Sequence, residues 1–408
     1  MLCSYITLKP LVHSIILQLT GILFFLGSCA GNASGQIQSF FVKPSATDVA
    51  YAEQDSHLVV YNNTLRIHKL LLFIGGTFSS PKHYAYFAGY AASLGFDVIS
   101  LTYPNSVLTT LLAGSSDSLA FNKFRQEICF GTPLSPWVNV DSLNSIYTRT
   151  VKLLRYLDSA YPAHNWAQYL SAPDSPDWSQ IILSGHSQGS GHACYLSKLY
   201  AAERVVMFSG PNDYSTYYSR PAPWLSEQGQ TPAGRYYVFL HLQDEIVPFE
   251  RQYANIAALG MLIADDTTCI DQLTPPFLNS HCLYSNSTIS GSPHNAPVIY
   301  PDTPLDNQGN PLFGAVWRYM LLEAIPASAA VSKKPQLLYI YPNPTTTLLC
   351  IKLFPERVSF VRIYSASGTL MGNYPLKSNP QCIAIRDWPA GLYYVQVKDA
   401  VTRLIISR

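Results

Sequence analysis

The most informative segment of this chain is Ile181-Ile182-Leu183-Ser184-Gly185-His186-Ser187-Gln188-Gly189. It begins with an apolar run, and the segment 190–196 that follows it holds small residues and no proline. This order predicts a buried strand, a sharp turn and a helix. A turn that tight needs glycine two residues before and two residues after Ser187, and it holds the serine hydroxyl clear of the backbone. Ser187 is therefore the candidate nucleophile.

Residues 36–324 alternate apolar runs with helical patterns. This alternation predicts an α/β fold with a mostly parallel sheet flanked by helices. Two longer segments, 105–140 and 211–234, are predicted to be irregular and to form a lid over the site. The other predicted elements are strands at 70–74, 96–101, 205–208 and 237–240 and helices at 84–94, 142–161 and 313–324.

A serine nucleophile needs a base, and the base needs an acid that orients it. Asp244 follows the predicted strand 237–240 in the loop His241-Leu242-Gln243-Asp244-Glu245-Ile246-Val247-Pro248. Further on, Gly291-Ser292-Pro293-His294-Asn295 places a histidine in a flexible loop. We expect His294 to take the Ser187 proton and Asp244 to orient the Nδ1 side of its ring.

Other residues could fill these roles. Asp213 also follows a predicted strand and is the alternative acid. If it is not the acid, it is expected to be a turn residue. His281 is the alternative base, although it adjoins Cys282. The remaining polar neighbours are expected to be structural: Glu245 as a solvated neighbour, His186 in shaping the turn, and His192 and Cys194 in packing the helix.

The oxyanion that forms during attack on a carbonyl needs two backbone N–H donors. Gln188 follows the nucleophile at a helix N-terminus and is expected to supply one of them. The loop Gly75-Gly76-Thr77-Phe78 follows the strand 70–74 and is expected to supply the other. Thr77 is the first choice there, and Gly76 is the second.

Charge is low and balanced, with 26 basic and 25 acidic residues and a net charge of +1. Nothing in this balance favours a nucleic-acid partner. No cysteine or histidine spacing resembles a zinc site, and the expected chemistry needs no metal or organic cofactor.

The N-terminus is typical of an export signal. Lys9 precedes the apolar segment 11–26, which is too short and too polar for a membrane span. We expect residues 1–30 to be a signal peptide cleaved after Ala30. The alternative is a lipid on Cys29, because Leu26-Gly27-Ser28-Cys29 is similar to a lipobox. No later segment approaches a membrane span.

Six cysteines remain after such a signal is removed, and an oxidising compartment permits disulfides among them. We expect Cys269 to pair first with Cys282, since the two flank a proline-rich loop. A pair between Cys350 and Cys382 is also possible. The pairing stays open at this point.

The composition changes at residues 325–336, which are rich in Ala, Ser, Lys and Pro and predict a linker. Beyond it, residues 337–408 hold only short strand-like runs and turns, which predict a small all-β sandwich. The predicted strands are 337–341, 348–353, 358–364, 381–385, 392–397 and 404–407.

Residues 60–325 resemble the α/β-hydrolase superfamily, and within it a group of secreted bacterial hydrolases. The motif that carries the resemblance runs from Trp178 to Ala193 and includes the glycines around Ser187; Leu101-Thr102-Tyr103-Pro104-Asn105 and Arg204-Val205-Val206 are also similar. The resemblance implies a Ser-His-Asp hydrolase with no defined substrate.

Residues 337–408 resemble the C-terminal sorting domain of type IX secretion cargo. The similar residues are Tyr341-Pro342-Asn343-Pro344, Val361-Arg362-Ile363-Tyr364 and Gly391-Leu392-Tyr393-Tyr394-Val395, with Arg403 and Arg408 as a basic end. The resemblance implies contact with the type IX secretion machinery and a secreted or cell-surface location. The alternative is an immunoglobulin-like accessory or sugar-binding sandwich.

Together these features predict a secreted serine hydrolase that cleaves an acyl bond, most simply an ester, through an acyl-enzyme. Two alternatives stay open: a peptidase on the same fold, and a surface binding protein that keeps the fold without catalysis.

Overall fold

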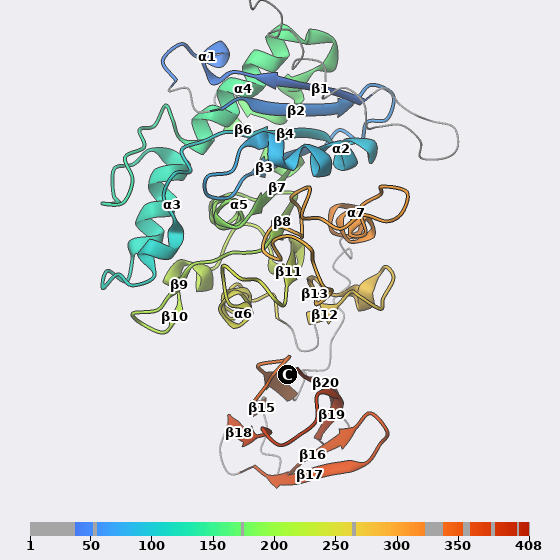
Figure 1. Ribbon diagram of the computed structural model, residues 1–408. Coiled ribbons are helices and arrows are strands. Elements are labelled where there is room, and N and C mark those ends of the chain that lie inside the picture. The colour runs from blue at the N-terminus through green and yellow to red at the C-terminus, as the bar shows by residue number, and fades with distance from the viewer. Residues whose placement is uncertain are drawn as a thin grey trace, which may run out of the picture. The chain divides into compact units, whose positions relative to one another are not determined.

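The computed structural model describes residues 37–51, 55–172, 175–262, 267–322, 338–353, 360–376, 380–397 and 400–407. The predicted signal peptide, its two processing alternatives and the linker 325–336 lie outside these ranges. Residues 37–322 and residues 338–407 form separate sets of sheets (Figure 1).

Residues 37–322 are built on a nine-stranded sheet with the strand order β1-β2-β4-β3-β7-β8-β11-β13-β12. β1 and β2 are antiparallel to each other, and β2 is antiparallel to β4. From β4 to β12 every neighbouring pair is parallel. This confirms the predicted mostly parallel sheet. The bounds are β1 Ile37–Val42, β2 His57–Asn62, β3 Leu70–Ile74, β4 Asp97–Leu101, β7 Ile181–His186, β8 Arg204–Phe208, β11 Tyr236–His241, β12 Thr267–Cys269 and β13 Cys282–Ser285.

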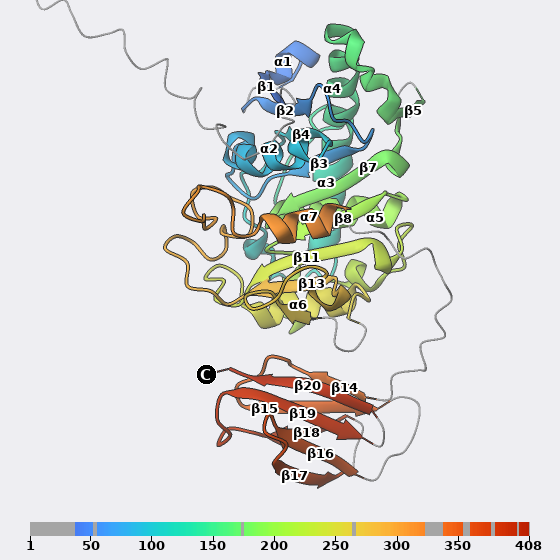
Figure 2. The same cartoon turned by 90° about the vertical axis from the view of Figure 1, so that its right-hand side faces the viewer.

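Helices cover both faces of this sheet (Figures 1 and 2). Alternate residues of β3 enter different cores: Leu70 and Leu72 pack in one apolar cluster, whereas Leu71 and Phe73 pack in the other. A strand that is buried on both faces has a continuous apolar sequence, and β3 has such a sequence. Helices α2 (Ala85–Ser93) and α7 (Gly314–Leu322) belong to the second cluster; α3 (Ala120–Phe130), α4 (Ile146–Ala160), α5 (Gln188–Leu199) and α6 (Phe249–Ala258) belong to the first.

Smaller elements complete this part of the chain. They are the one-turn helix α1 (Pro44–Thr47), the pair β5 (Leu170–Ala172) with β6 (Ser175–Pro176), and the pair β9 (Tyr214–Ser215) with β10 (Arg220–Pro221).

The prediction that 105–140 is irregular was wrong for its middle part, which is helix α3. Phe121, Phe124 and Ile128 repeat at helical spacing and are buried in the core. That spacing is the signal that would have revealed the helix. Helix α6 was missed as well.

The chain changes direction in the sheet between β3 and β7. After β3 it passes through α2 to β4 on one side, and β7, β8 and β11 then follow on the other side. The loops that leave the carboxyl ends of β3 and β7 therefore diverge and open a crevice between them. Thr77 and Ser187 lie on these two loops.

Residues 338–407 form two antiparallel sheets, β14-β15-β18 and β17-β16-β19-β20, around one apolar core. This confirms the expected separate β structure, with β17 as an additional strand. The bounds are β14 Leu338–Tyr341, β15 Leu348–Leu353, β16 Phe360–Ser365, β17 Leu370–Pro375, β18 Gln381–Ala384, β19 Gly391–Val397 and β20 Ala400–Ile406.

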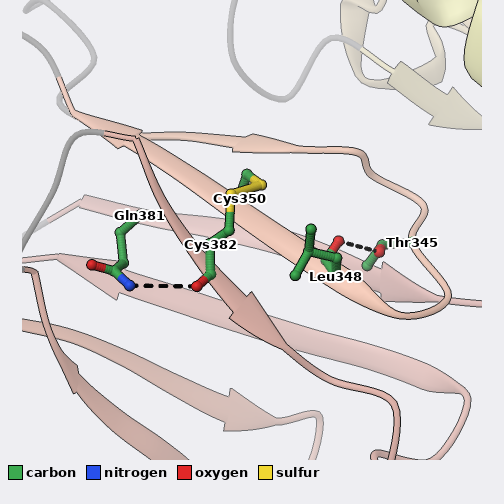
Figure 3. Close-up of a disulfide and its surroundings, with 5 residues drawn as sticks. All are labelled: Thr345, Leu348, Cys350, Gln381 and Cys382. Carbon is green, nitrogen blue, oxygen red and sulfur yellow. Dashed lines mark hydrogen bonds between the residues drawn. A yellow bond between two sulfur atoms is a disulfide. The ribbon is translucent and has the colours of Figure 1, made fainter.

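Cys350 and Cys382 form a disulfide between neighbouring strands (Figure 3). The two residues are direct partners in the antiparallel register of β15 and β18. Close to it, the Thr345 hydroxyl donates to the Leu348 carbonyl at 2.6 Å.

The expected pair of Cys269 with Cys282 was wrong, since no disulfide joins these two described residues. The two strands that carry them are parallel neighbours, but Cys269 is in register with Tyr284. The cysteines are thus offset by two residues along the strands. The Cys269 thiol contacts Asp271 Oδ2 at 3.5 Å instead.

Among the ranges described above, no helix is both long and apolar enough to cross a membrane.

Candidate active site

Ser187 occupies the turn between β7 and α5 in a strained conformation. Its φ is 53° and its ψ is −116°, a combination rare outside glycine. The Ser187 N–H donates to the Phe208 carbonyl at 2.9 Å, which ties the turn to the end of β8. A serine held in a strained conformation at a strand-to-helix turn has its hydroxyl exposed.

The glycines on either side of Ser187 are required by close backbone contacts. A Cβ atom on Gly189 would lie 1.9 Å from the Ile74 carbonyl oxygen, and one on Gly185 would lie 2.3 Å from the Gly189 carbonyl carbon. The start of α5 is thus pressed against both β3 and its own preceding strand. Any larger residue would push the turn away from the sheet.

His294 and Asp244 meet across two loops at the carboxyl end of the sheet. His294 Nδ1 lies 2.7 Å from Asp244 Oδ2, and both residues are buried. The backbone N–H groups of Ile246 and Val247 donate to Asp244 Oδ1 at 2.9 and 2.8 Å. Burial opposes the charge, but the bond to His294 and these N–H donors outweigh it and lower the pKa of Asp244. These contacts therefore favour the ionised form of Asp244.

Ser187 and His294 line the same cavity of about 320 Å³. Because Asp244 occupies Nδ1, Nε2 is the imidazole nitrogen left for a partner in the cavity. Thr77 and His186 also line it. The structure thus brings the predicted nucleophile, base and acid loop to one opening.

The three candidate oxyanion donors differ in what they already bind. The Gly76 N–H donates to the Tyr84 hydroxyl at 2.8 Å, so this donor is occupied. Within the described part of the chain, no protein acceptor takes the N–H of Thr77 or of Gln188. The Thr77 hydroxyl also donates to the Gln188 side-chain oxygen, which ties the two loops together. These contacts favour Thr77 and Gln188 over Gly76.

Asp213, the alternative acid, lies in a buried ion pair. Arg125 contacts its two carboxylate oxygens at 3.0 and 2.5 Å, and the Trp224 indole N–H donates to it at 2.9 Å. Arg125 Nη1 also donates to the Gln188 carbonyl at 2.7 Å. Asp213 therefore supports the start of α5 from inside the core, while Asp244 contacts His294.

Arg125 is a site-supporting residue that the sequence analysis missed, because it lies on the unpredicted helix α3. Gly191 leaves room for it, since a Cβ there would lie 2.1 Å from Arg125 Nη2. Burial opposes the guanidinium charge, but Asp213 outweighs this effect and raises the pKa of Arg125.

His186 links two of the site loops. The Tyr84 hydroxyl, which accepts from Gly76, lies 3.2 Å from His186 Nδ1. His186 Nε2 lies 3.1 Å from the His294 carbonyl, an acceptor only, so Nε2 carries the proton and donates. Burial lowers the pKa of His186 to about 3, which keeps the ring neutral. The expected role in shaping the turn thus extends to the His294 loop.

Glu245 was expected to be a solvated neighbour of Asp244, but it also contacts the His294 loop. Its carboxylate accepts from the His294 N–H at 3.0 Å and from the Ser292 hydroxyl. The Ser209 hydroxyl donates to the His294 carbonyl at 2.7 Å. The backbone of His294 is therefore fixed from both sides.

The other candidates lie away from the cavity. His281 precedes β13, stacks on Tyr237 with 4.1 Å between ring centroids and contacts the Tyr236 carbonyl at 3.1 Å. His192 is buried in α5, where burial holds its pKa well below the usual value. Cys194 is buried in the same helix, and burial raises the pKa of its thiol to about 12.

In the described ranges, no three His, Cys, Asp or Glu side chains are grouped so that they could hold a metal ion.

No curated protein matches the chain in sequence. Among solved structures, the chain is similar to a Klebsiella pneumoniae protein assigned as a dienelactone hydrolase, at 12% identity and a TM-score of 0.36. The match covers 71% of this chain and 98% of that one.

The C-terminal part matches a known family. Residues 339–407 match the secretion system C-terminal sorting domain. The strands of this match enclose a core of their own, described above. Residues 339–407 are therefore a type IX secretion sorting domain, and the protein is exported to the cell surface or released beyond it.

Proposed function

We propose that this exported protein is a serine hydrolase of the α/β-hydrolase fold that cleaves an acyl bond, most simply an ester. The observation that carries the proposal is the 2.7 Å contact between His294 and Asp244 on the cavity that also holds the strained Ser187. The parallel strand order with a turn of this geometry after β7 supports the fold.

In the first step the Ser187 oxygen attacks the carbonyl carbon of the substrate, and its proton passes to His294 Nε2. The imidazolium that results is stabilised by the ionised Asp244. The carbonyl oxygen becomes an oxyanion, which accepts hydrogen bonds from the Thr77 and Gln188 N–H groups.

In the second step the carbon–oxygen bond to the alcohol breaks, and the alcohol leaves with the proton from His294. Water then attacks the acyl-enzyme and gives its proton to His294. Collapse of the second intermediate releases the carboxylic acid, and His294 returns the proton to Ser187. These steps require no cofactor.

The proposal divides the chain as its sequence predicts. Residues 36–324 form the catalytic domain, residues 1–30 are the signal peptide, and residues 325–336 link the catalytic domain to the β-sandwich at 337–408.

Replacement Ser187→Ala tests the nucleophile. We expect turnover of p-nitrophenyl acetate and labelling by a fluorophosphonate to be lost, with the thermal unfolding midpoint little changed. Ser93→Ala, at an exposed serine of α2, is the matched control and should keep both activities. Full labelling of the Ser187→Ala protein would contradict the assignment.

The same experiment separates the alternatives. A catalytically inactive binding protein would leave wild-type Ser187 unlabelled, because an unactivated serine does not react. A peptidase would be labelled but would prefer aminoacyl p-nitroanilides to esters of the same acyl group.

A further inference from the structure

Three exposed apolar side chains meet at the mouth of the cavity. Phe78 is 66% exposed, Ile246 is 54% exposed and Leu108 is 41% exposed, and all three line the cavity. They come from three separate loops, which follow β3, β11 and β4 in turn. Exposed apolar surface that gathers at a cavity marks a ligand-binding surface more strongly than scattered apolar residues do.

The backbone at Phe78 is strained in a way that displays this ring. Its φ is 57°, an unfavourable value for an aromatic residue. The Phe78 N–H donates to the Asn105 carbonyl at 3.0 Å, and the Asn105 amide donates to the carbonyls of Gly76 and Ser79 at 2.8 and 2.9 Å. Asn105 thus holds the loop in this conformation. Strained backbone conformations are found mostly at functional sites, and Phe78 lies next to Thr77, a candidate oxyanion donor.

The ionisable side chains that line the cavity are all histidines. None of the described residues that line it is Asp, Glu, Lys or Arg. Burial lowers the pKa of His83, with nearby Lys82 acting in the same direction, and burial lowers that of His186 to about 3. An ionised substrate group would lose water here and would find no Asp, Glu, Lys or Arg among the described lining residues to pair with, which is costly.

We propose that the site takes uncharged esters whose acyl group is a compact apolar chain seated against Phe78, Ile246 and Leu108. This inference rests on the proposed function. At about 30 Å³ for each water-sized group, the cavity of about 320 Å³ has room for about ten non-hydrogen atoms. The hexanoyl group, with about seven non-hydrogen atoms, fits that space, and chains that exceed it extend past the apolar mouth into solvent.

The test is a substrate series on the full chain: p-nitrophenyl acetate, butyrate, hexanoate and the anionic hemisuccinate. We expect kcat/KM to rise from acetate to hexanoate by up to about fourfold per methylene, the value for full burial of each group. The hemisuccinate has the four-carbon chain of butyrate with a carboxylate in place of the terminal methyl group, and we expect its kcat/KM to be more than about tenfold lower than that of butyrate.

Replacement Phe78→Ser should reduce the hexanoate-to-acetate ratio of kcat/KM, and Ile246→Ser should do the same. Phe41→Ser is the matched control, since Phe41 is 55% exposed on β1 and does not line the cavity. It should keep the wild-type ratio.

A flat chain-length series overturns the proposal, as does a hemisuccinate rate equal to that of butyrate. Equal loss on all esters in Phe78→Ser and Ile246→Ser overturns the assignment of the apolar group to this mouth. Ester turnover that survives Ser187→Ala rejects the proposed function instead. If esters react too slowly, labelling rates of Ser187 with ethyl and hexyl fluorophosphonates make the same comparison.

Discussion

Replacement Asp244→Asn tests how the proposed acid controls the proposed base. Oδ1 of the new side chain keeps the N–H donors of Ile246 and Val247, because it occupies the same position. The new amide NH₂ then faces His294 Nδ1, where the carboxylate lay at 2.7 Å. Two donors cannot bond, so His294 must accept at Nδ1 and carry its proton on Nε2. In that tautomer it cannot take the Ser187 proton.

The size of the effect follows from the bond that is lost. Losing a hydrogen bond to a charged group raises the barrier by about 1.5–3 kcal/mol. That is a loss of about 10- to 160-fold in rate. The wrong tautomer adds to this loss, and the same change in other Ser-His-Asp triads costs about 10⁴-fold in kcat. We expect kcat to fall by about 10³- to 10⁴-fold.

Stability should change much less than the rate. The Gln252 amide donates to Asp244 Oδ2 at 3.0 Å, and its own oxygen has no hydrogen-bond partner among the described residues. A flip of the Gln252 amide would present this oxygen to the new NH₂ group. We therefore expect the free energy of unfolding to fall by less than about 1 kcal/mol.

The assay is turnover of p-nitrophenyl acetate per folded molecule, with folding measured by urea denaturation. Asp213→Asn is the matched control because Asp213 is the alternative acid. This control removes the partner of the buried Arg125, so it should destabilise the protein by about 3–5 kcal/mol. Turnover per folded molecule of Asp213→Asn should still be at least about 100-fold higher than that of Asp244→Asn. A larger loss per folded molecule in Asp213→Asn would refute the reasoning.

Three further predictions concern the turn, acid stability and export. Gly189→Ala should prevent stable folding or sharply lower the unfolding midpoint, because its Cβ would lie 1.9 Å from the Ile74 carbonyl oxygen; an unchanged midpoint would contradict this. Burial opposes ionisation of Asp97, but hydrogen bonds from His164 and other donors outweigh it and lower the pKa of Asp97. The stability that ionised Asp97 contributes is therefore complete above its unfolded-state pKa of about 3.9, and it is lost as pH falls through the lower pKa of the folded state. Asp97→Asn should therefore show a weaker dependence of the urea midpoint on pH below about pH 4 than wild type, and an equal dependence would count against it. Deleting residues 339–407 should leave the protein inside the cell envelope, as measured by surface proteolysis and by immunoblot of the medium, whereas normal export of the truncated chain would rule out the sorting role.

Much of the site could be predicted because its signals are local. Gly185 is needed by contacts with Gly189 and Ser190 inside the turn, so this part of the turn is visible in the sequence, whereas Gly189 is needed because β3 lies against it. Asp244 follows the predicted strand 237–240 and His294 lies in a later loop, which is the expected chain order, and the carboxyl ends of parallel strands share one edge of the sheet. Their direct contact could be expected but not measured from sequence.

The missed features depend on packing between distant segments. Arg125 supports the Gln188 carbonyl from a helix that is 63 residues away in sequence. The cysteine pairs depend on strand register, which places Cys350 opposite Cys382 but sets Cys269 two positions away from Cys282. Neither relation appears in the spacing of residues along the chain.

The turn at Ser187, the change from an α/β pattern to a β pattern and the sorting-domain motifs within 337–408 could be recognised in the sequence alone. Each of these depends on local sterics or on hydrophobic periodicity. Only the tertiary structure decided between Asp244 and Asp213 as the partner of His294, and only it placed Phe78 at the cavity mouth. Those choices depend on which loops the sheet brings together, and strand order is a property of the whole fold.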